Sequence, residues 1–452
     1  MVPVLQGHRT MRETLPLTVG SPALEVNGPP NTGRKRYIVC PFEDANDPES
    51  WSGTPYYFLR ACKAEGLLDE ALPMLAQDDV GRLTGKVLWN LKRALTEGRL
   101  GGYWYSERSF EDVWAPILPR LEDAVAICCA CPMPLSVSRN RKITKWLFID
   151  QTSRQSLEDN CSSAVDARLR NMLYSRETGA YQMCEGIIAH SRWAASSVVA
   201  DYEISRDKVY VVVPGANLDP AAYDVWHRNE AASAFIRRLQ SPVLRVVFCG
   251  HDDFYRKGLD RLIEGVSWAK ANGFRGRLSI YGRFPEAVTR SYSTMNNIEF
   301  AGSINKEKEP IRFMQLLADN DVACLVSRKE AGGTVLREFA ALGLPTIVTR
   351  VGGIPDHAIE SASIMLPQAV TPEGIGETLL KLESDHCLRE RLQRAAWDAH
   401  ETALWPASIS KFRTFWPYQS GEADKRTGAA MHLTHRAPRE RLPLSLHESN
   451  DR

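Results

Sequence analysis

The chain has 452 residues, of which 44% are hydrophobic and 25% are charged. This length favours two or three domains, and the composition is that of an ordinary globular protein. Lysine and arginine (56) nearly cancel aspartate and glutamate (55), so the net charge of +1 gives no strongly basic surface and argues against nucleic acid as a partner.

No stretch is long and apolar enough to be expected to cross a bilayer, which takes about 20 apolar residues. The longest candidate, residues 124–137, has 14 residues and two prolines, which is typical of a buried strand and its exit loop. The N-terminal sequence lacks the continuous apolar core of a signal peptide. We therefore expect a cytoplasmic protein, for which peripheral contact with a membrane stays open.

Ten cysteines in a chain of this length do not indicate a disulfide-stabilised protein. Cys128 and Cys131 form a C-x-x-C spacing around Cys129, but two prolines follow and no second pair lies elsewhere. A redox or metal site would need a helix N-terminus or further ligands. The spacing therefore predicts cysteines packed in a buried strand.

Strands and helices alternate in the first half of the chain. Residues 1–35 lack periodicity and predict a disordered arm. A strand at 37–40, a polar loop containing Gly53 and a helical pattern from 57 to 67 form the opening of a nucleotide-binding α/β unit. Residues 70–120 show helical periodicity only around 87–89. Further elements are expected as strands at 124–130, 146–149 and 209–213 and as helices around 179–189 and 193–202.

An aromatic cluster at Tyr103, Trp104 and Tyr105 allows two interpretations. The rings could stack on a bound ligand, or they could pack in the core or at a domain edge. We favour packing, because aromatic side chains supply much of the buried apolar surface of a domain.

After a connector at 219–241, the alternation begins again. Strands are expected at 243–249, 278–281, 298–300, 322–326 and 345–349, and helices at 259–271, 311–318, 334–342 and 371–382. A helix pair at 388–402 and 407–416 precedes an unpatterned tail. One α/β sheet rarely restarts so completely, so the sequence predicts two Rossmann-like domains with a cleft between them.

Residues 327–356, SRKEAGGTVLREFAALGLPTIVTRVGGIPD, contain the most informative pattern. Gly332 and Gly333 can bring the backbone close to a ligand, and Thr334 opens a helix whose N–H groups can bind an anion such as a diphosphate. Glu330 precedes this helix and Glu338 lies within it, eight residues later. One carboxylate can thus face a sugar held before the helix, while the other can accept hydrogen bonds from hydroxyls further along the same ligand.

This segment resembles the E-x7-E region of retaining glycosyltransferases of family 4, which have the GT-B fold. The resemblance rests on Glu330-Ala331-Gly332-Gly333-Thr334 with Glu338, Gly343-Leu344-Pro345-Thr346, and Gly352-Gly353-Ile354-Pro355-Asp356. Upstream matches are Phe248-Cys249-Gly250-His251, Lys257-Gly258-Leu259-Asp260, Leu278-Ser279-Ile280-Tyr281-Gly282, Asn297-Ile298-Glu299-Phe300-Ala301-Gly302, Ser191-Arg192-Trp193-Ala194, Asp207-Lys208-Val209 and Val213-Pro214-Gly215-Ala216-Asn217. The resemblance is good over residues 185–400 and loose over 37–184.

By this resemblance, Glu330 would contact the donor sugar, Glu338 would bind the ribose, and Lys257 would neutralise the diphosphate. The amides around Thr334 and Val335 would bind diphosphate oxygens. The remaining candidates for the donor site are Gly53, which would approach the diphosphate from the N-terminal domain, and Gly250, His251, Gly282, Arg283, Gly332 and Gly333. Asp150, at a strand end, is the candidate for a catalytic group near the reacting sugar.

Two positions depart from the family pattern. His251 stands in place of an arginine, although Arg256 is close in sequence, and Asp356 replaces the usual glutamate. A histidine is largely neutral near pH 7, so phosphate neutralisation would be weaker or shared.

Each candidate also has a plain structural interpretation. Glu330 and Glu338 could be unrelated acids, Lys257 a solvated lysine, His251 a turn cap, Gly53 a loop former and Asp150 a helix N-cap. The surrounding motif favours the functional interpretation for the two glutamates, Lys257 and Gly53. We expect His190 to be a packed interior histidine.

The resemblance implies a retaining hexosyltransferase (EC 2.4 type) of glycan biosynthesis, which uses a UDP- or GDP-type sugar as donor, and no metal or further cofactor. The acceptor could be a glycan, a lipid-linked molecule or a small molecule. Alternatives are a nucleotide-sugar epimerase of the same fold and a catalytically degenerate GT-B binding subunit. The expected domains are an acceptor domain (36–225), a donor domain (240–395), a C-terminal helix that packs back on the first domain (396–419) and a disordered tail (420–452).

Overall fold

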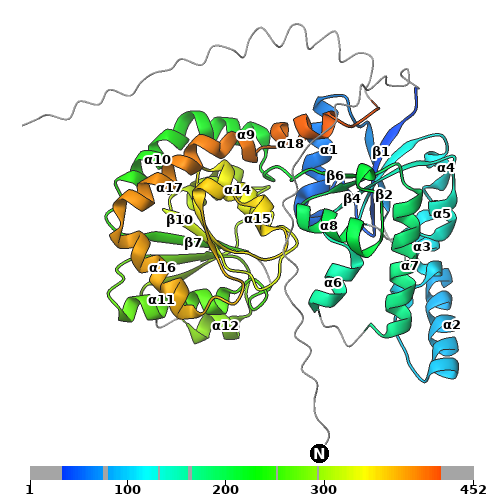
Figure 1. The fold of residues 1–452 in the computed structure, drawn as a ribbon, viewed down its shortest axis with the longest axis horizontal. Helices are drawn as coiled ribbons and strands as arrows, with labels where there is room; N and C mark the ends of the chain where they lie inside the picture. Colours follow the sequence, from blue (N-terminus) through cyan, green and yellow to red (C-terminus); the bar gives the residue numbers. More distant parts are fainter. Residues whose placement is uncertain are drawn as a thin grey trace, which may run out of the picture.

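The computed structural model describes residues 33–74, 80–130, 133–160, 165–250, 253–292 and 295–418. His251, Cys131, the predicted tail and all but the last three residues of the predicted arm lie outside the described residues. Each half of the described chain is built around one parallel sheet, and the two sheets lie side by side (Figure 1). The domain limits given above stay predictions.

The first sheet joins six described strands in the order β2-β1-β3-β4-β5-β6. Their bounds are β1 (Arg36–Pro41), β2 (Glu70–Met74), β3 (Val125–Cys129), β4 (Thr144–Ile149), β5 (Gly186–Ala189) and β6 (Val209–Val211). The central strands β1, β3, β4 and β5 are buried almost throughout, because helices cover both faces of a parallel sheet.

Two strands of this sheet differ from the sequence-based expectation. Residues 186–189 form β5, so the predicted helix around 179–189 is wrong in its second half; that helix ends at Met183. β2 lies in the stretch that gave no strand pattern, and it contains Pro73. Proline has no backbone N–H to donate. An edge strand tolerates this, because one side of its backbone has no neighbouring strand that would need the hydrogen bond.

The second sheet joins six described strands in the order β12-β11-β10-β7-β8-β9. Their bounds are β7 (Arg245–Cys249), β8 (Arg277–Tyr281), β9 (Ile298–Gly302), β10 (Val322–Leu325), β11 (Thr346–Thr349) and β12 (Ser363–Leu366). Renumbered from its first strand, this is the 3-2-1-4-5-6 order of a Rossmann domain. All strands except the short edge strand β12 were expected.

The helices of the first half are α1 (Thr54–Ala64), α2 (Val80–Glu97), α3 (Glu107–Trp114), α4 (Leu118–Leu121), α5 (Leu135–Arg139), α6 (Ser153–Asn160), α7 (Ala167–Met183) and α8 (Arg192–Asp201). Those of the second half are α9 (Pro220–Trp226), α10 (Ala232–Leu239), α11 (Leu259–Ala271), α12 (Glu286–Ser291), α13 (Pro310–Ala318), α14 (Val335–Ala341), α15 (Ile354–His357), α16 (Pro372–Ser384), α17 (His386–Ala399) and α18 (Trp405–Arg413). Several begin at a side-chain cap; Asp166, Ser191, Thr371 and Asp385 each accept a hydrogen bond from an amide of the first turn.

Both sheets have a point where the strand order reverses, between β1 and β3 in the first sheet and between β7 and β10 in the second. In open α/β sheets, ligands bind beyond the carboxyl ends of the strands at such a point, because the loops there diverge. The loops that follow β1, β7 and β10 contain Gly53, Lys257 and Glu330 respectively. The fold therefore places these three predicted residues where a ligand site is expected.

The chain crosses between the domains twice. It leaves the first domain after β6, and it returns from α17 to α18, which lies beside α1 (Figure 1). The two crossings touch, since the amide of Ala216 donates to the carbonyl of Ala403 over 2.7 Å. A Cβ at Gly215 would come within 2.4 Å of the Trp405 nitrogen, so glycine is required for this contact.

No described helix is long and apolar enough to span a membrane. Cys128 and Cys129 lie in β3 and are buried, and burial raises the pKa of both thiols. The expectation that these cysteines pack in a buried strand is confirmed.

We predict that Phe412→Ala destabilises the protein by about 3 to 5 kcal/mol. Phe412 is fully buried in α18 and packs edge-on against Phe58 of α1, with 5.3 Å between ring centroids. Urea unfolding would measure the loss, with the exposed neighbour Lys411→Ala as control, expected to change stability by less than about 0.5 kcal/mol. Equal stability of the two variants would show that α18 is not part of the first domain's core.

Candidate functional site

Glu330 lies in the loop after β10, and basic side chains from the loop before α11 surround its carboxylate. Arg256 contacts the carboxylate over 3.2 Å and Lys257 over 3.8 Å, both at Oε2. The Glu330 side chain is 10% exposed and that of Lys257 is 17% exposed. Arg256, noted from the sequence only as a neighbour of His251, thus provides a second cation beside the predicted lysine.

Two glycine contacts fix the position of the Glu330 loop. A Cβ at Gly352 would lie 1.8 Å from the Glu330 carbonyl oxygen, and a Cβ at Gly353 would lie 2.0 Å from that of Ala331. Any larger residue would push the loop away, since atoms do not approach so closely. The Gly352-Gly353 pair of the sequence motif therefore allows close packing against the backbone of the Glu330 loop.

Glu338 is buried in α14 and pairs with Lys306, whose Nζ lies 2.6 Å from Oε1. The Lys306 ammonium also lies 5.9 Å from the ring centroid of Tyr57, which belongs to α1 of the first domain. The Tyr57 hydroxyl donates to Glu307 over 3.0 Å. The loop between β9 and α13 therefore joins the predicted ribose-binding acid to the opposite domain.

The loop before α1 has a left-handed backbone at three successive residues. The φ angles of Trp51, Ser52 and Gly53 are 44°, 58° and 84°. Two non-glycine residues in this region cost about 1 to 3 kcal/mol each, so surrounding contacts must hold them. Fully buried Asn217 does so by donating to the Ser52 carbonyl over 2.8 Å. The side-chain oxygen of Asn217 accepts a hydrogen bond from the Trp405 indole, so this loop is tied to α18.

Asp150 follows β4, and the Trp51 side chain interacts with its carboxyl group. Burial is the main cause that raises its pKa to about 6, and the negative charge of Glu330 raises it further. Trp51 also stacks on His190, with 5.4 Å between centroids. A Cβ at Gly353 would lie 2.9 Å from the Ser191 side chain, so the loop after β11 and the loop after β5 meet across the domain interface.

His190 is buried between Trp51 and Phe148, as the sequence predicted. Burial, with a smaller effect of His357, holds its pKa well below the usual value, so the ring is neutral at pH 7. Its Nε2 has no hydrogen-bond partner among the described residues. His357 of α15 is buried as well, and burial lowers its pKa to about 3. A Cβ at Gly332 would lie 2.5 Å from the His357 ring.

The remaining predicted donor-site residues lie around the ends of β7, β8 and α14. A Cβ at Gly282 would lie 1.8 Å from the Gly250 carbonyl oxygen, so these two loops touch, and Arg283 next to them is exposed. Thr334 is the residue before α14 and Val335 is its first residue. His251 lies outside the described residues, so its predicted role stays a prediction.

The interface also contains an ion pair that the sequence did not indicate. Asp356 of α15 accepts hydrogen bonds from the backbone amide of Arg192 over 2.6 Å and from its guanidinium over 2.5 Å. Arg192 is the first residue of α8 in the first domain. The shorter acid at position 356, a departure from the family pattern, therefore serves a contact between the domains.

Three further side chains belong to this site and were missed from the sequence: Trp51, Lys306 and His357. Lys306 and Glu307 lie in a run of charges (Asn305-Lys306-Glu307-Lys308-Glu309) that is typical of a solvated loop. Trp51 stood in the predicted Gly53 loop, but only the fold shows that its indole reaches Asp150.

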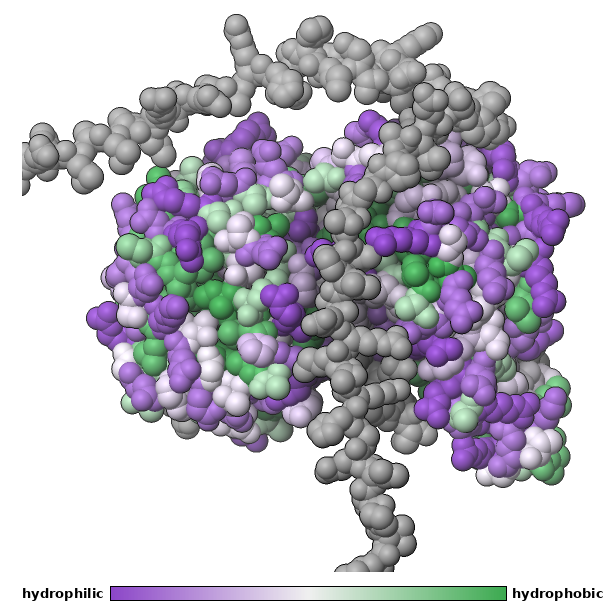
Figure 2. All heavy atoms as spheres, viewed as in Figure 1, coloured by the Kyte–Doolittle hydropathy of each residue, from purple (hydrophilic) through white to green (hydrophobic). Residues whose placement is uncertain are grey.

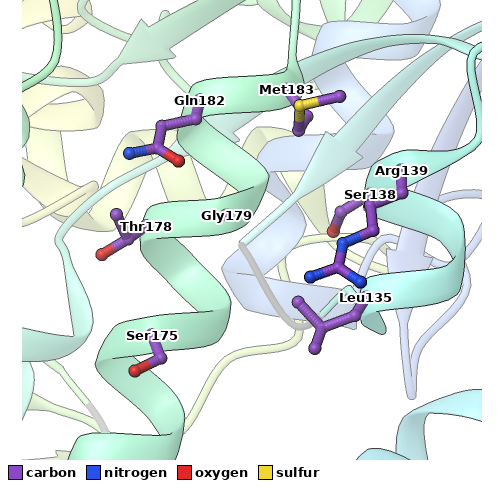
Figure 3. Close-up of a pocket in the computed structure, with 8 residues that line it drawn as sticks. All are labelled: Leu135, Ser138, Arg139, Ser175, Thr178, Gly179, Gln182 and Met183. Carbon is purple, nitrogen blue, oxygen red and sulfur yellow. The ribbon is translucent and has the colours of Figure 1, made fainter.

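A separate groove of about 400 Å³ lies between α5 and α7, on the first domain (Figure 3). Its lining includes Arg139, Thr178 and Gln182, and it contains none of the predicted site residues. No group of three or more His, Cys, Asp or Glu side chains arranged to hold a metal ion occurs within the described ranges.

Comparison with known sequences gives a family match for the second half of the chain. Residues 236–398 match the family described as "Glycosyl transferases group 1". This segment is thus similar to that family. D-inositol 3-phosphate glycosyltransferase of Xylanimonas cellulosilytica is 25% identical over 229 residues, which are 49% of this chain and 54% of that relative. The chain thus spans about half the length of this curated relative.

Two solved structures share the fold of most of the chain. Sucrose-phosphate synthase from Thermosynechococcus elongatus has a TM-score of 0.59 at 14% identity and covers 88% of this chain and 100% of its own. WaaG, a glycosyltransferase involved in lipopolysaccharide biosynthesis, has a TM-score of 0.53 at 14% identity and covers 87% and 100%. The expected GT-B fold is confirmed, and the epimerase alternative gains no support.

The raised pKa of Asp150 makes the stability of the protein depend on pH. An unfolded aspartate titrates near pH 4, whereas Asp150 titrates near 6 in the folded protein. The folded state holds the proton more tightly, so the contribution of this residue to stability is present below pH 4 and is lost as the pH rises through 6. We predict that Asp150→Asn gains about 2 kcal/mol relative to wild type between pH 4 and pH 7.

Urea unfolding of both proteins at the two pH values measures this difference. The exposed Asp224→Asn is the control and should show no such trend. An advantage of Asp150→Asn that does not change with pH would contradict the prediction.

Proposed function

We propose that the protein transfers a sugar from a nucleotide-sugar donor to an acceptor hydroxyl. The observation that carries this proposal is the position of Lys257 and Arg256 beside Glu330, at the strand reversal of the second domain. A nucleotide diphosphate needs cations where its leaving group gains charge, and a sugar needs a carboxylate that accepts from its hydroxyls. This small cluster supplies both.

In this proposal the donor lies along the second domain. Glu338 accepts hydrogen bonds from the ribose hydroxyls, Lys257 and Arg256 face the diphosphate, and the sugar lies near Glu330. Gly53 allows the strained loop of the first domain to approach the diphosphate from the other side. Two cations already stand beside the expected leaving group, so we propose that they serve in place of a metal ion.

The reaction exchanges one bond for another. The bond between the anomeric carbon and the diphosphate oxygen breaks, the acceptor oxygen bonds to the same carbon, and the acceptor proton passes to the departing phosphate. Attack on the face from which the phosphate leaves would retain the anomeric configuration; this part of the proposal rests on the resemblance to family 4. In the first domain, the neutral ring of His190 and the partly protonated Asp150 support this proposal, in which Asp150 would interact with the reacting sugar.

The donor site is tested by isothermal titration with UDP, GDP and ADP. We predict that one of the three nucleotides binds and that Glu338→Ala weakens its affinity about 10- to 100-fold, the effect of losing charge-assisted hydrogen bonds. The exposed Glu286→Ala on α12 should bind as wild type does. If none of the three binds at millimolar concentration, the donor proposal fails and a degenerate binding subunit is favoured.

Turnover tests the role of the cations. With the donor that carries the identified nucleotide, Lys257→Met should lower the rate of nucleotide release about 100-fold or more, because a preorganised charge at the leaving group is lost. Lys270→Met, an exposed lysine in the last turn of α11, is the matched control and should retain the full rate. Equal rates for the two variants would remove Lys257 from the mechanism.

A further inference from the structure

Exposed apolar side chains gather in one part of the first domain. Of the eleven large hydrophobic residues that are exposed in the described chain, seven lie between residues 83 and 104. They are Leu83 (63% exposed), Val87, Leu88, Leu91, Leu95 (78%), Leu100 and Trp104. Figure 2 shows some apolar residues among hydrophilic ones at the lower right, where α2 projects from the domain in Figure 1. Monomeric proteins rarely expose such a group of apolar side chains unless it binds another protein, a membrane or a ligand.

The apolar residues form a stripe along α2. Leu83, Val87, Leu91 and Leu95 follow one another at intervals of four residues, so they lie on one face of the helix, and Leu88 borders them. We call this face the leucine stripe. α2 is amphipathic, with one apolar face and the remainder polar, as in helices that lie in the interface of a membrane.

The opposite face of α2 is attached to the domain, so the leucine stripe is held in a fixed direction. The Trp89 indole donates to the Gly101 carbonyl over 2.9 Å, and Arg93 donates to the same oxygen over 2.9 Å. Arg93 is 5% exposed and also pairs with Asp166, the residue that caps α7. A Cβ at Gly85 would lie 2.9 Å from the Tyr103 hydroxyl. The stripe therefore faces away from all elements that hold the helix.

The charges around the stripe are mostly positive. Residues 80–100 contain five basic residues and one acidic residue. The acidic residue, Glu97, is already paired with Arg93 and Arg168. Lys86 and Lys92 are exposed on the helix. The surface thus combines apolar side chains with the exposed lysines Lys86 and Lys92, the combination that binds the interface of an anionic bilayer.

We propose that α2 docks the protein on an anionic lipid surface, with the leucine stripe among the acyl chains and Lys86 and Lys92 at the headgroups. A second copy of the chain is a poorer occupant, because a two-fold contact through the stripe would bring like charges together. The inference does not depend on the proposed glycosyl transfer, since it uses none of the site residues.

Vesicle flotation with the full chain tests the proposal. Wild type should float with phosphatidylcholine vesicles that contain about one-third phosphatidylglycerol, and much less with phosphatidylcholine alone. The double variant Leu91→Glu/Leu95→Glu should lose at least about tenfold in the bound fraction, as should Lys86→Glu/Lys92→Glu. Ile236→Glu, which changes an exposed apolar residue on α10, is the matched control and should bind as wild type does.

All changed side chains are exposed, so circular dichroism and thermal unfolding should match wild type. Binding that is absent, or that the leucine and lysine variants leave unchanged, would overturn the proposal. Sedimentation that shows a dimer dissolved by Leu91→Glu/Leu95→Glu, without vesicle binding, would overturn it in favour of self-association. Nucleotide titration of the same variants should be unchanged, which separates this test from that of the donor site.

Discussion

The buried guanidinium of Arg337 holds together the segments on which the site depends. From α14 it donates to the carbonyl oxygens of Pro214 over 3.1 Å, Thr402 over 2.5 Å and His357 over 3.3 Å. Pro214 and Thr402 lie on the two chain crossings. Burial lowers the pKa of Arg337 to about 10, and without these acceptors a buried cation would cost several kcal/mol. Glu338 is the next residue, so the same helical turn binds the two chain crossings and carries a carboxylate of the candidate site.

The second domain could be predicted closely from the sequence. Its buried parallel strands are continuous apolar runs, and glycine, proline or a cap separates them from helices; the helix expected at 259–271 is α11 with the same limits. In the first domain the signals are weaker. β2 carries a proline at a sheet edge, and β5 follows α7 after only two residues, so an apolar pattern there fits a continuing helix as well as a strand.

The candidate site could be predicted where a residue and the residues that support it lie in one short segment. Glu330, Gly352 and Gly353 lie in one motif, and the structure shows that the glycines are needed because the Glu330 loop rests on them. Partners that come from other segments were not predictable. Lys306 pairs with Glu338 from 32 residues away, and Trp51 meets Asp150 only after β1 and β4 are aligned in the sheet. A single sequence records the type of such residues but not their neighbours.

The contacts between the domains differ in kind from one end to the other. Away from the crossings they are ionic or polar and partly exposed, namely the Arg192–Asp356 pair and the Tyr57–Glu307 hydrogen bond. At the crossings they are buried bonds to carbonyl oxygens and apolar packing around Trp405. Dissolved ions screen exposed charges over about 10 Å at 0.1 M but reach buried groups far less. Rising ionic strength therefore weakens the exposed ionic contacts between the domains, while the buried contacts at the two chain crossings stay intact.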